Sequence, residues 1–278
     1  MLVVALALAA TLCGATGTFL TKSLSIRMPA WQVVGPLFLI NALLVIPFIP
    51  FGPHWHSFEP SILAIHFASV VVLCASTACM FALITRGRAS GVAVGQALSP
   101  AATLIAAPLL LGVLITPLTV IGAAALMLGA LIPLRRSFDG IGSAGVVGIL
   151  LVMGLCNGMV GVLTAMLAVR GVGLPETYVV RAALAAVVFL AIFPPKDLRG
   201  RDIPPLAIRA AFVTASFVLT ILAIQRGNVI VIQSILATVP LVVIGLEWIR
   251  HRSRPDHGIV VGSLIAFVGL LVLLRLAV

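Results

Sequence analysis

Long apolar stretches alternate with short polar segments along the whole chain. About ten of these stretches are long enough to cross a hydrocarbon layer of ~30 Å as helices of roughly 20 residues. Their expected positions are residues 2–20, 31–50, 61–83, 90–111, 117–134, 145–167, 176–194, 205–225, 229–249 and 257–276. The runs are continuous and lack the alternation that barrel strands need, so helices are expected. The pattern predicts an all-α integral membrane protein with ten transmembrane helices and no soluble domain.

Two predicted spans carry matching stripes of small and polar residues. The stripes are Thr11, Gly14, Thr18 and Thr21 in the first span, and Gly154, Asn157, Gly161 and Thr164 in the sixth. Steps of three and four place each set on one helical face. Close helix packing is one interpretation, because glycine, serine and threonine are common at membrane helix interfaces. Asn157 favours a cavity, since an unpaired amide in lipid is costly; a hydrogen bond to the first span is the alternative.

The second half of the chain repeats the first at a constant offset of 140 residues. The matches are Ala75-Ser76 with Ala215-Ser216, Arg86-Gly87 with Arg226-Gly227, Pro100 with Pro240, Gly122 with Gly262, and Gly129 with Gly269. Agreement at proline, Arg-Gly and spaced glycines is not expected by chance, so we infer a duplication. The units are residues 1–138 and 139–278. Each contains five spans, an odd number, so we predict two inverted five-helix repeats, as in many secondary transporters.

Prolines interrupt corresponding spans of the two units. Pro100 and Pro240 cannot donate to the carbonyls four residues earlier, so each helix is expected to expose a backbone acceptor at mid-membrane. Interrupted helices at matching places point to a substrate site, although such kinks are also often structural. The polar residues nearby are Gln96, Ser99 and Thr103 in the fourth span, and Gln233, Ser234 and Thr238 in the ninth.

These segments resemble a known family. "ALITRGRASGVAVGQALSPAATLIAAPLLLG" and "TPLTVIGAAALMLGALI" are similar to the fourth and fifth helices of the drug/metabolite transporter (DMT) superfamily, EamA type. "AIQRGNVIVIQSILATVP" and "VGSLIAFVGLLVLL" are similar to the ninth and tenth. The resemblance implies ten helices, a central cavity lined mainly by helices 1, 3, 4, 6, 8 and 9, and movement of small organic solutes.

Composition and charge agree with a membrane location. Hydrophobic residues make up 62% of the chain, charged residues 9%, and the mean hydropathy is +1.29. That leaves too little polar surface to cover a soluble globule. The formal net charge is +10, but the basic residues fall almost entirely in the loops. They are read as topology signals, and no nucleic-acid partner is expected.

The positions of the basic residues predict an orientation. Loops after odd-numbered spans hold Lys22, Arg27, Arg86, Arg88, Arg135, Arg136, Lys196, Arg199, Arg201, Arg250, Arg252 and Arg254. Loops after even-numbered spans hold only Arg170 and Arg226. By the positive-inside rule the odd loops face the cytoplasm and both termini lie outside. The family resemblance implies the reverse, with both termini inside.

A few charged residues lie within predicted spans. Arg181, near Glu176 and Tyr178, could hold an anionic group such as a carboxylate; the alternatives are snorkelling to the interface or pairing with Glu176. Glu247 is a candidate for a titrating, coupling residue, as is Glu176. Pairing with Arg250 is the other interpretation of Glu247.

The histidines are weaker candidates. His66 could line the cavity, although a lone histidine is more often a hydrogen-bonded packing residue. The loop "HWHSFEP" offers His54, His56 and Glu59, but a solvated loop with Trp55 at the membrane interface explains it better. No metal site is therefore expected.

Taken together, these patterns predict a secondary transporter. We expect an exporter of small organic metabolites, amino-acid-like compounds or drugs, working by alternating access. The candidate substrate-binding residues are Thr18, His66, Gln96, Ser99, Asn157, Thr164, Tyr178, Arg181, Gln233, Ser234 and Thr238. A flippase for a lipid-linked intermediate or a passive channel are the alternatives. No enzyme motif is present and no cofactor is expected; the expected partners are a small-molecule substrate and the lipid bilayer, for a monomer in a prokaryotic inner membrane.

Overall fold

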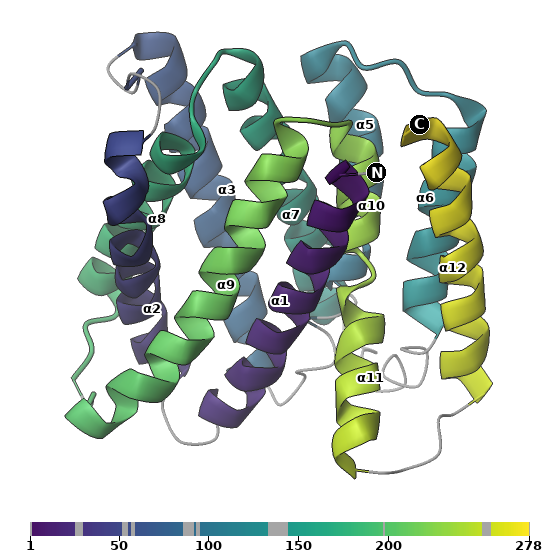
Figure 1. The fold of residues 1–278 in the computed structure, drawn as a ribbon. Coiled ribbons are helices and arrows are strands. Elements are labelled where there is room, and N and C mark those ends of the chain that lie inside the picture. Colours follow the sequence, from purple (N-terminus) through teal and green to yellow (C-terminus); the bar gives the residue numbers. More distant parts are fainter. Residues whose placement is uncertain are drawn as a thin grey trace.

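Every element described by the computed structural model is a helix (Figure 1). It describes residues 2–25, 30–51, 55–56, 59–85, 92, 95–132, 144–196, 198–251 and 257–277. The helices are α1 (Leu2–Ser25), α2 (Ala30–Val45), α3 (Pro60–Thr85), α5 (Ser99–Leu111), α6 (Pro117–Leu131), α7 (Ala144–Val169), α8 (Leu174–Ile192), α9 (Ile203–Ile224), α10 (Val229–Leu236), α11 (Val239–His251) and α12 (His257–Ala277), with short 3₁₀ helices η1 (Ile46–Phe51) and η3 (Gly200–Asp202). Within the described residues there is no strand, which confirms the predicted all-α class.

The bundle has the surface of a membrane protein. Among the described residues, seven helical stretches are long and apolar enough to cross a bilayer, and three shorter apolar helices cover residues 95–111, 117–131 and 260–273. Large apolar side chains such as Leu109, Phe67 and Phe267 point outward and are exposed. Contact of such a surface with lipid chains is favourable, whereas its contact with water is unfavourable. An integral membrane protein follows, and the crossing by all ten predicted spans stays a prediction.

Prolines explain where the helices depart from the predicted spans. The stretch predicted over 31–50 is α2 followed by the 3₁₀ helix η1, whose Pro47 and Pro50 have no N–H for α-helical bonds. The stretch predicted over 229–249 is two helices, α10 and α11, separated by a turn at Ala237–Thr238. In the stretch predicted over 90–111, a turn at Leu98 likewise precedes α5.

Helices of one half pack mainly against helices of the other. In the first half of the chain lie α1, α2, α3, α5 and α6, and in the second lie α7 to α12. The main pairs are α1 with α9, α3 with α7, α2 with α8, α5 with α7, and α6 with α12, and α1 also packs against α10 and α11. Pairs within one half, such as α2 with α3 or α8 with α9, make smaller contacts.

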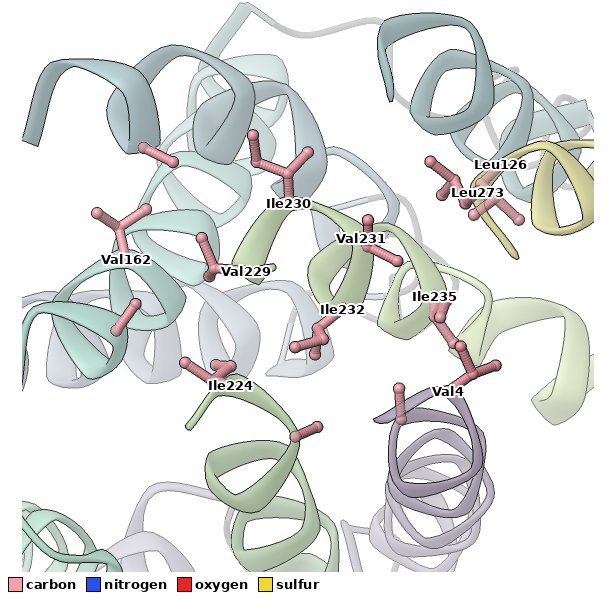
Figure 2. Packing of buried hydrophobic residues seen from close by; sticks show 14 of the residues in the cluster. Val4, Leu126, Val162, Ile224, Val229, Ile230, Val231, Ile232, Ile235 and Leu273 are labelled. Carbon is pink, nitrogen blue, oxygen red and sulfur yellow. The ribbon is translucent and has the colours of Figure 1, made fainter. Parts of the chain in front are cut away.

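The short helix α10 lies at the centre of the largest hydrophobic cluster (Figure 2). All seven residues from Val229 to Ile235 are buried. Neighbours come from α1, α6, α7, α9 and α12, including Val4, Leu126, Val162 and Leu273. A helix made mainly of valine, isoleucine and leucine is expected to be enclosed in this way. Its first turn is fixed by Asn228, whose side-chain oxygen accepts from the N–H of Ile230 at 2.8 Å.

Glycines hold α6 and α12 close together. The facing residues are Gly122 and Gly129 of α6 with Gly262 and Gly269 of α12, and we name this contact the glycine seam. These are the glycines that recur between the two halves of the sequence. Because glycine has no side chain, the two backbones can approach each other closely. In lipid, helices are not driven together by the hydrophobic effect, so such van der Waals contacts stabilise the pair.

Candidate functional site

A cavity of about 380 Å³ lies between the two halves. Side chains from α1, α2 and α3, together with Val92, Gln96 and Ser99, line it from the first half, and side chains from α7, α8, α9, α10 and α11 line it from the second. The resemblance led us to expect helices 1, 3, 4, 6, 8 and 9. The described lining contains all six and also α2 and α8, the second and seventh spans, while α6 and α12 contribute no described lining residue.

The polar stripes on α1 and α7 face this cavity. Thr18 and Thr164 line it, and each hydroxyl donates to the carbonyl four residues earlier in its own helix, at 2.9 and 2.7 Å. Thr11, by contrast, is buried away from the cavity. The spacing of the polar residues therefore predicted which face of α1 and of α7 lines the cavity. It did not predict how far along each helix the cavity extends.

Asn157 is held by the third span rather than the first. Its Oδ1 accepts a hydrogen bond from Ser76 Oγ of α3 at 2.7 Å, and both residues line the cavity. The expected alternative, a bond to the first span, is corrected by this geometry. A hydroxyl that donates to Asn157 leaves the amide nitrogen as the group able to donate to an occupant.

The interrupted helices bring two glutamines to the cavity. Gln96 and Gln233 line it, as do Ser99 and Pro240. The Oε1 atom of Gln96 is buried and has no hydrogen-bond partner among the described residues. In the second half, the Gln233 amide packs directly against Gly161 of α7, so there is no room for a side chain at Gly161.

Three neighbouring candidates do not line the cavity. Ser234 and Thr238 bond to backbone carbonyls of α10, donating to Ile230 and Ile235 at 2.7 Å each. Pro100 is buried at the start of α5. The exposed acceptor expected at Gln96 is also corrected, because Ser99 Oγ donates to that carbonyl at 2.9 Å.

Two buried arginines line the cavity. Arg181 of α8 is 3% exposed, and its guanidinium donates to Thr164 Oγ1 at 2.9 Å. Arg209 of α9 is 8% exposed, and its Nε donates to Thr21 Oγ1 of α1 at 2.7 Å. Snorkelling of Arg181 is thereby excluded. Sequence reasoning missed Arg209, although a single charge six residues inside the apolar stretch that starts at Ile203 was a usable signal.

A second group of buried polar residues, which includes His66, Glu176 and Tyr178, lies outside the cavity lining. Glu176 is buried; its carboxylate accepts from the backbone N–H of His56 at 2.9 Å and lies 3.7 Å from His66 Nε2. Tyr178 donates to Thr214 Oγ1 at 3.0 Å. His66, Glu176 and Tyr178 do not line the cavity, which differs from the expectation for His66 and Tyr178.

Glu247, the other candidate for coupling, has a side chain outside the described residues. Its helix, α11, contributes Val239, Val243 and Ile244 to the cavity wall. A coupling role for Glu247 or Glu176 therefore stays a prediction.

Comparison with known proteins identifies the family. The sequence model of the EamA-like transporter family matches residues 1–135 and 144–275, so that almost the whole chain is covered in two units. No curated protein matches the chain. Among 19 matching chains of solved structures, one described only as "Crystal structure of protein" is 18% identical and covers 96% of this chain and 97% of its own, with a TM-score of 0.73. That likeness shows a shared fold. Because the family match extends over both halves and fits the two-repeat helical bundle, the chain belongs to the EamA-like transporter family.

Proposed function

We propose that this protein is a secondary transporter that exports small organic solutes by alternating access between two inverted five-helix repeats. One observation carries the proposal: a cavity lies where the halves meet, and spans one to four of each half line it with both polar and apolar residues. A site shared equally by two repeats is what alternating access requires, because rocking one repeat against the other opens the same site to either side.

The arrangement of helices supports the inverted relation. Exchanging the two halves turns the pair α1–α9 into α7–α3, and the pair α5–α7 into α11–α1, and all of these pairs are in contact. The pairs α2–α8 and α6–α12 are unchanged by the exchange. Figure 1 shows α6 beginning on the side of the bundle where its counterpart α12 ends. This scheme favours a two-fold axis in the membrane plane.

The interrupted helices support a moving part beside the cavity. The turn at Ala237–Thr238 joins α10 to α11, and Leu236, Val239 and Pro240 around it line the cavity. Because Pro240 has no N–H, the two helices are not connected by a continuous α-helical ladder at this point. We infer that α11 can change its angle relative to the enclosed helix α10 as the cavity opens.

Metabolite profiling of cells and medium tests the proposal. Cells that overexpress the protein should release specific small solutes faster than cells that express Asn157→Ala or Gln96→Ala, because both residues line the cavity. Thr18→Val and Thr16→Val form a matched pair on α1. Both hydroxyls bond to their own helix, but only Thr18 lines the cavity. Thr16→Val should therefore leave export unchanged, while Thr18→Val reduces it.

Ionophores separate a coupled carrier from a passive channel. A coupled carrier should lower the internal solute concentration below the external one, and it should lose this ability when ion gradients are collapsed. A passive channel should not produce such a difference with or without ionophores. Equal release by wild type, Asn157→Ala and Gln96→Ala at matched protein levels would contradict transport through this cavity.

A further inference from the structure

The two arginines give the cavity a positive charge that no described lining residue balances. Arg181 and Arg209 are the charged residues in the described lining, which contains no aspartate or glutamate. The nearby buried carboxylate, Glu176, contacts His56 and His66 and does not line the cavity. Buried charges are costly unless paired, and in membrane segments they usually mark a substrate or ion path.

Threonines hold both guanidinium groups without neutralising them. The hydroxyls of Thr21 and Thr164 each donate to a carbonyl of their own helix, at 2.8 and 2.7 Å. Each hydroxyl proton is thus already used, and the oxygen is free to accept from an arginine. Arg181 donates to Thr164 and Arg209 to Thr21 in this way. A neutral acceptor orients a guanidinium but leaves its full charge for an occupant.

Arg181 retains donor capacity inside this wall. Its Nε is buried and has no hydrogen-bond partner within the described structure. A guanidinium carries five N–H donors in a planar fork that matches the two oxygens of a carboxylate. The geometry of Arg181, fixed at one nitrogen and unpaired at another, suits a bound oxyanion.

The rest of the wall is apolar and partly aromatic. Phe19, Phe38, Phe81 and Phe217 line the cavity together with leucine, valine, isoleucine and methionine side chains. The volume of about 380 Å³ falls within the range of roughly 300–1,000 Å³ that is typical of small-ligand sites. An occupant that fits this wall has an apolar body and one charged end.

Within the described lining, the charged residues come only from the second half. The positions that correspond to Arg181 and Arg209 in the first half are Asn41 and Ser69. Asn41 lines the cavity as a neutral amide, and Ser69 is buried outside it. An anionic group is therefore drawn toward α8 and α9, so a bound solute takes one orientation.

From these observations we propose that the cavity selects organic anions, namely carboxylates with an apolar body, whose charged end is bound by Arg181 and Arg209. This inference rests on the proposed transport function and names its substrate class. Arg181 and Arg209 contribute charge-assisted hydrogen bonds, and the phenylalanines enclose the apolar body.

Binding to the purified protein in detergent tests the substrate class. The probes share one aromatic body: 3-phenylpropionate and phenylsuccinate carry carboxylates, whereas 3-phenylpropionamide is neutral and 3-phenylpropylammonium is cationic. Isothermal titration calorimetry at constant ionic strength should detect the two anions and neither of the others. Arg181→Gln and Arg209→Gln should each weaken anion binding by about tenfold or more, the effect of losing hydrogen bonds to a charged group.

Matched variants separate recognition from folding. Arg226 is exposed and donates to Leu222 within its own segment, so Arg226→Gln should bind the anions as wild type does. Arg181→Lys and Arg209→Lys keep the charge and should bind more tightly than the glutamine variants. Without ligand, the glutamine variants should unfold at the wild-type temperature or above it, because a desolvated charge has been removed. A purely structural role predicts the opposite, a lower melting temperature with unchanged anion affinity.

Three results would overturn the proposal. They are equal binding of the carboxylate and its amide, full anion affinity in both glutamine variants, and stabilisation by phosphatidylglycerol alone, which would assign the arginines to a lipid headgroup. Because binding needs no flux, the two proposals can fail separately. Anion binding without any transport in liposomes contradicts the transporter, whereas transport of solutes without anion binding contradicts only the substrate class.

Discussion

The glycine seam makes a sharp stability prediction for Gly129→Ala. A methyl group at Gly129 would lie 2.6 Å from the carbonyl oxygen of Gly262 and 2.6 Å from the backbone nitrogen of Ala266. Ordinary van der Waals contact begins at 3.4 Å, so the shortfall is 0.8 Å. Both clashing atoms belong to the backbone, so no change of side-chain rotamer can relieve the contact. Hence α6 and α12 must move apart.

Two opposing effects decide the size of the change. Alanine in place of glycine favours the helix by about 0.5–1 kcal/mol. A radial gap of about 0.5–1 Å removes about a quarter to a half of the dispersion energy of each atom pair, and overpacking of a close contact costs about 1–3 kcal/mol. The loss of packing should therefore exceed the gain in helix propensity. At roughly 2–4 °C per kcal/mol, we expect the melting temperature to fall by a few degrees.

Thermal unfolding of the purified protein in detergent measures this difference. Gly148→Ala is the matched control, because a methyl group on that helical glycine would meet no atom of the described residues within 4 Å. Its melting temperature should equal or exceed that of wild type. Gly269→Ala meets backbone atoms at 2.9 Å, so it should lie between the other two variants. If Gly129→Ala unfolded at the same temperature as Gly148→Ala, the close approach of α6 and α12 would be refuted.

Three further predictions concern single side chains and the orientation of the chain. Tyr178→Phe removes the donor to Thr214 and should lower the free energy of unfolding by about 0.5–1.5 kcal/mol, measured by thermal unfolding of the purified protein. Glu176→Gln replaces the buried carboxylate that accepts from the His56 N–H and should lower it by more, about 1.5–3 kcal/mol, in the same measurement. Leu2→Cys, in a variant without the four native cysteines, should react in intact cells with a membrane-impermeant maleimide if the positive-inside prediction is correct; protection until the cells are lysed would support termini inside.

Local patterns predicted the features that depend on one helix at a time. Apolar length located the helices, and steps of three and four identified the cavity faces of α1 and α7. The matching prolines located the interrupted helices, although Pro240 did not reveal that the turn lies at Ala237–Thr238. Each of these properties is set by neighbours within a few residues, so the sequence displays it directly.

Features that depend on distant partners were not predictable. Arg209 itself was recognisable as a charge inside an apolar stretch, but its partner Thr21, which lies 188 positions away in the chain, was not. His66 and Glu176 meet only because α3 and α8 are adjacent in the bundle. For Ser234 and Thr238, the sequence could not distinguish a hydroxyl that faces the cavity from one that donates to a nearby backbone carbonyl. Either arrangement gives the hydroxyl proton a hydrogen-bond acceptor.

The dominance of contacts between halves has a consequence for biosynthesis. At a synthesis rate of about 5–20 residues per second, the second half leaves the ribosome roughly 7–28 s after the first. During that interval α1, α2, α3 and α6 lack their principal packing partners, since α9, α8, α7 and α12 have not yet been synthesised. The first half can therefore complete its packing only after the later helices have been synthesised.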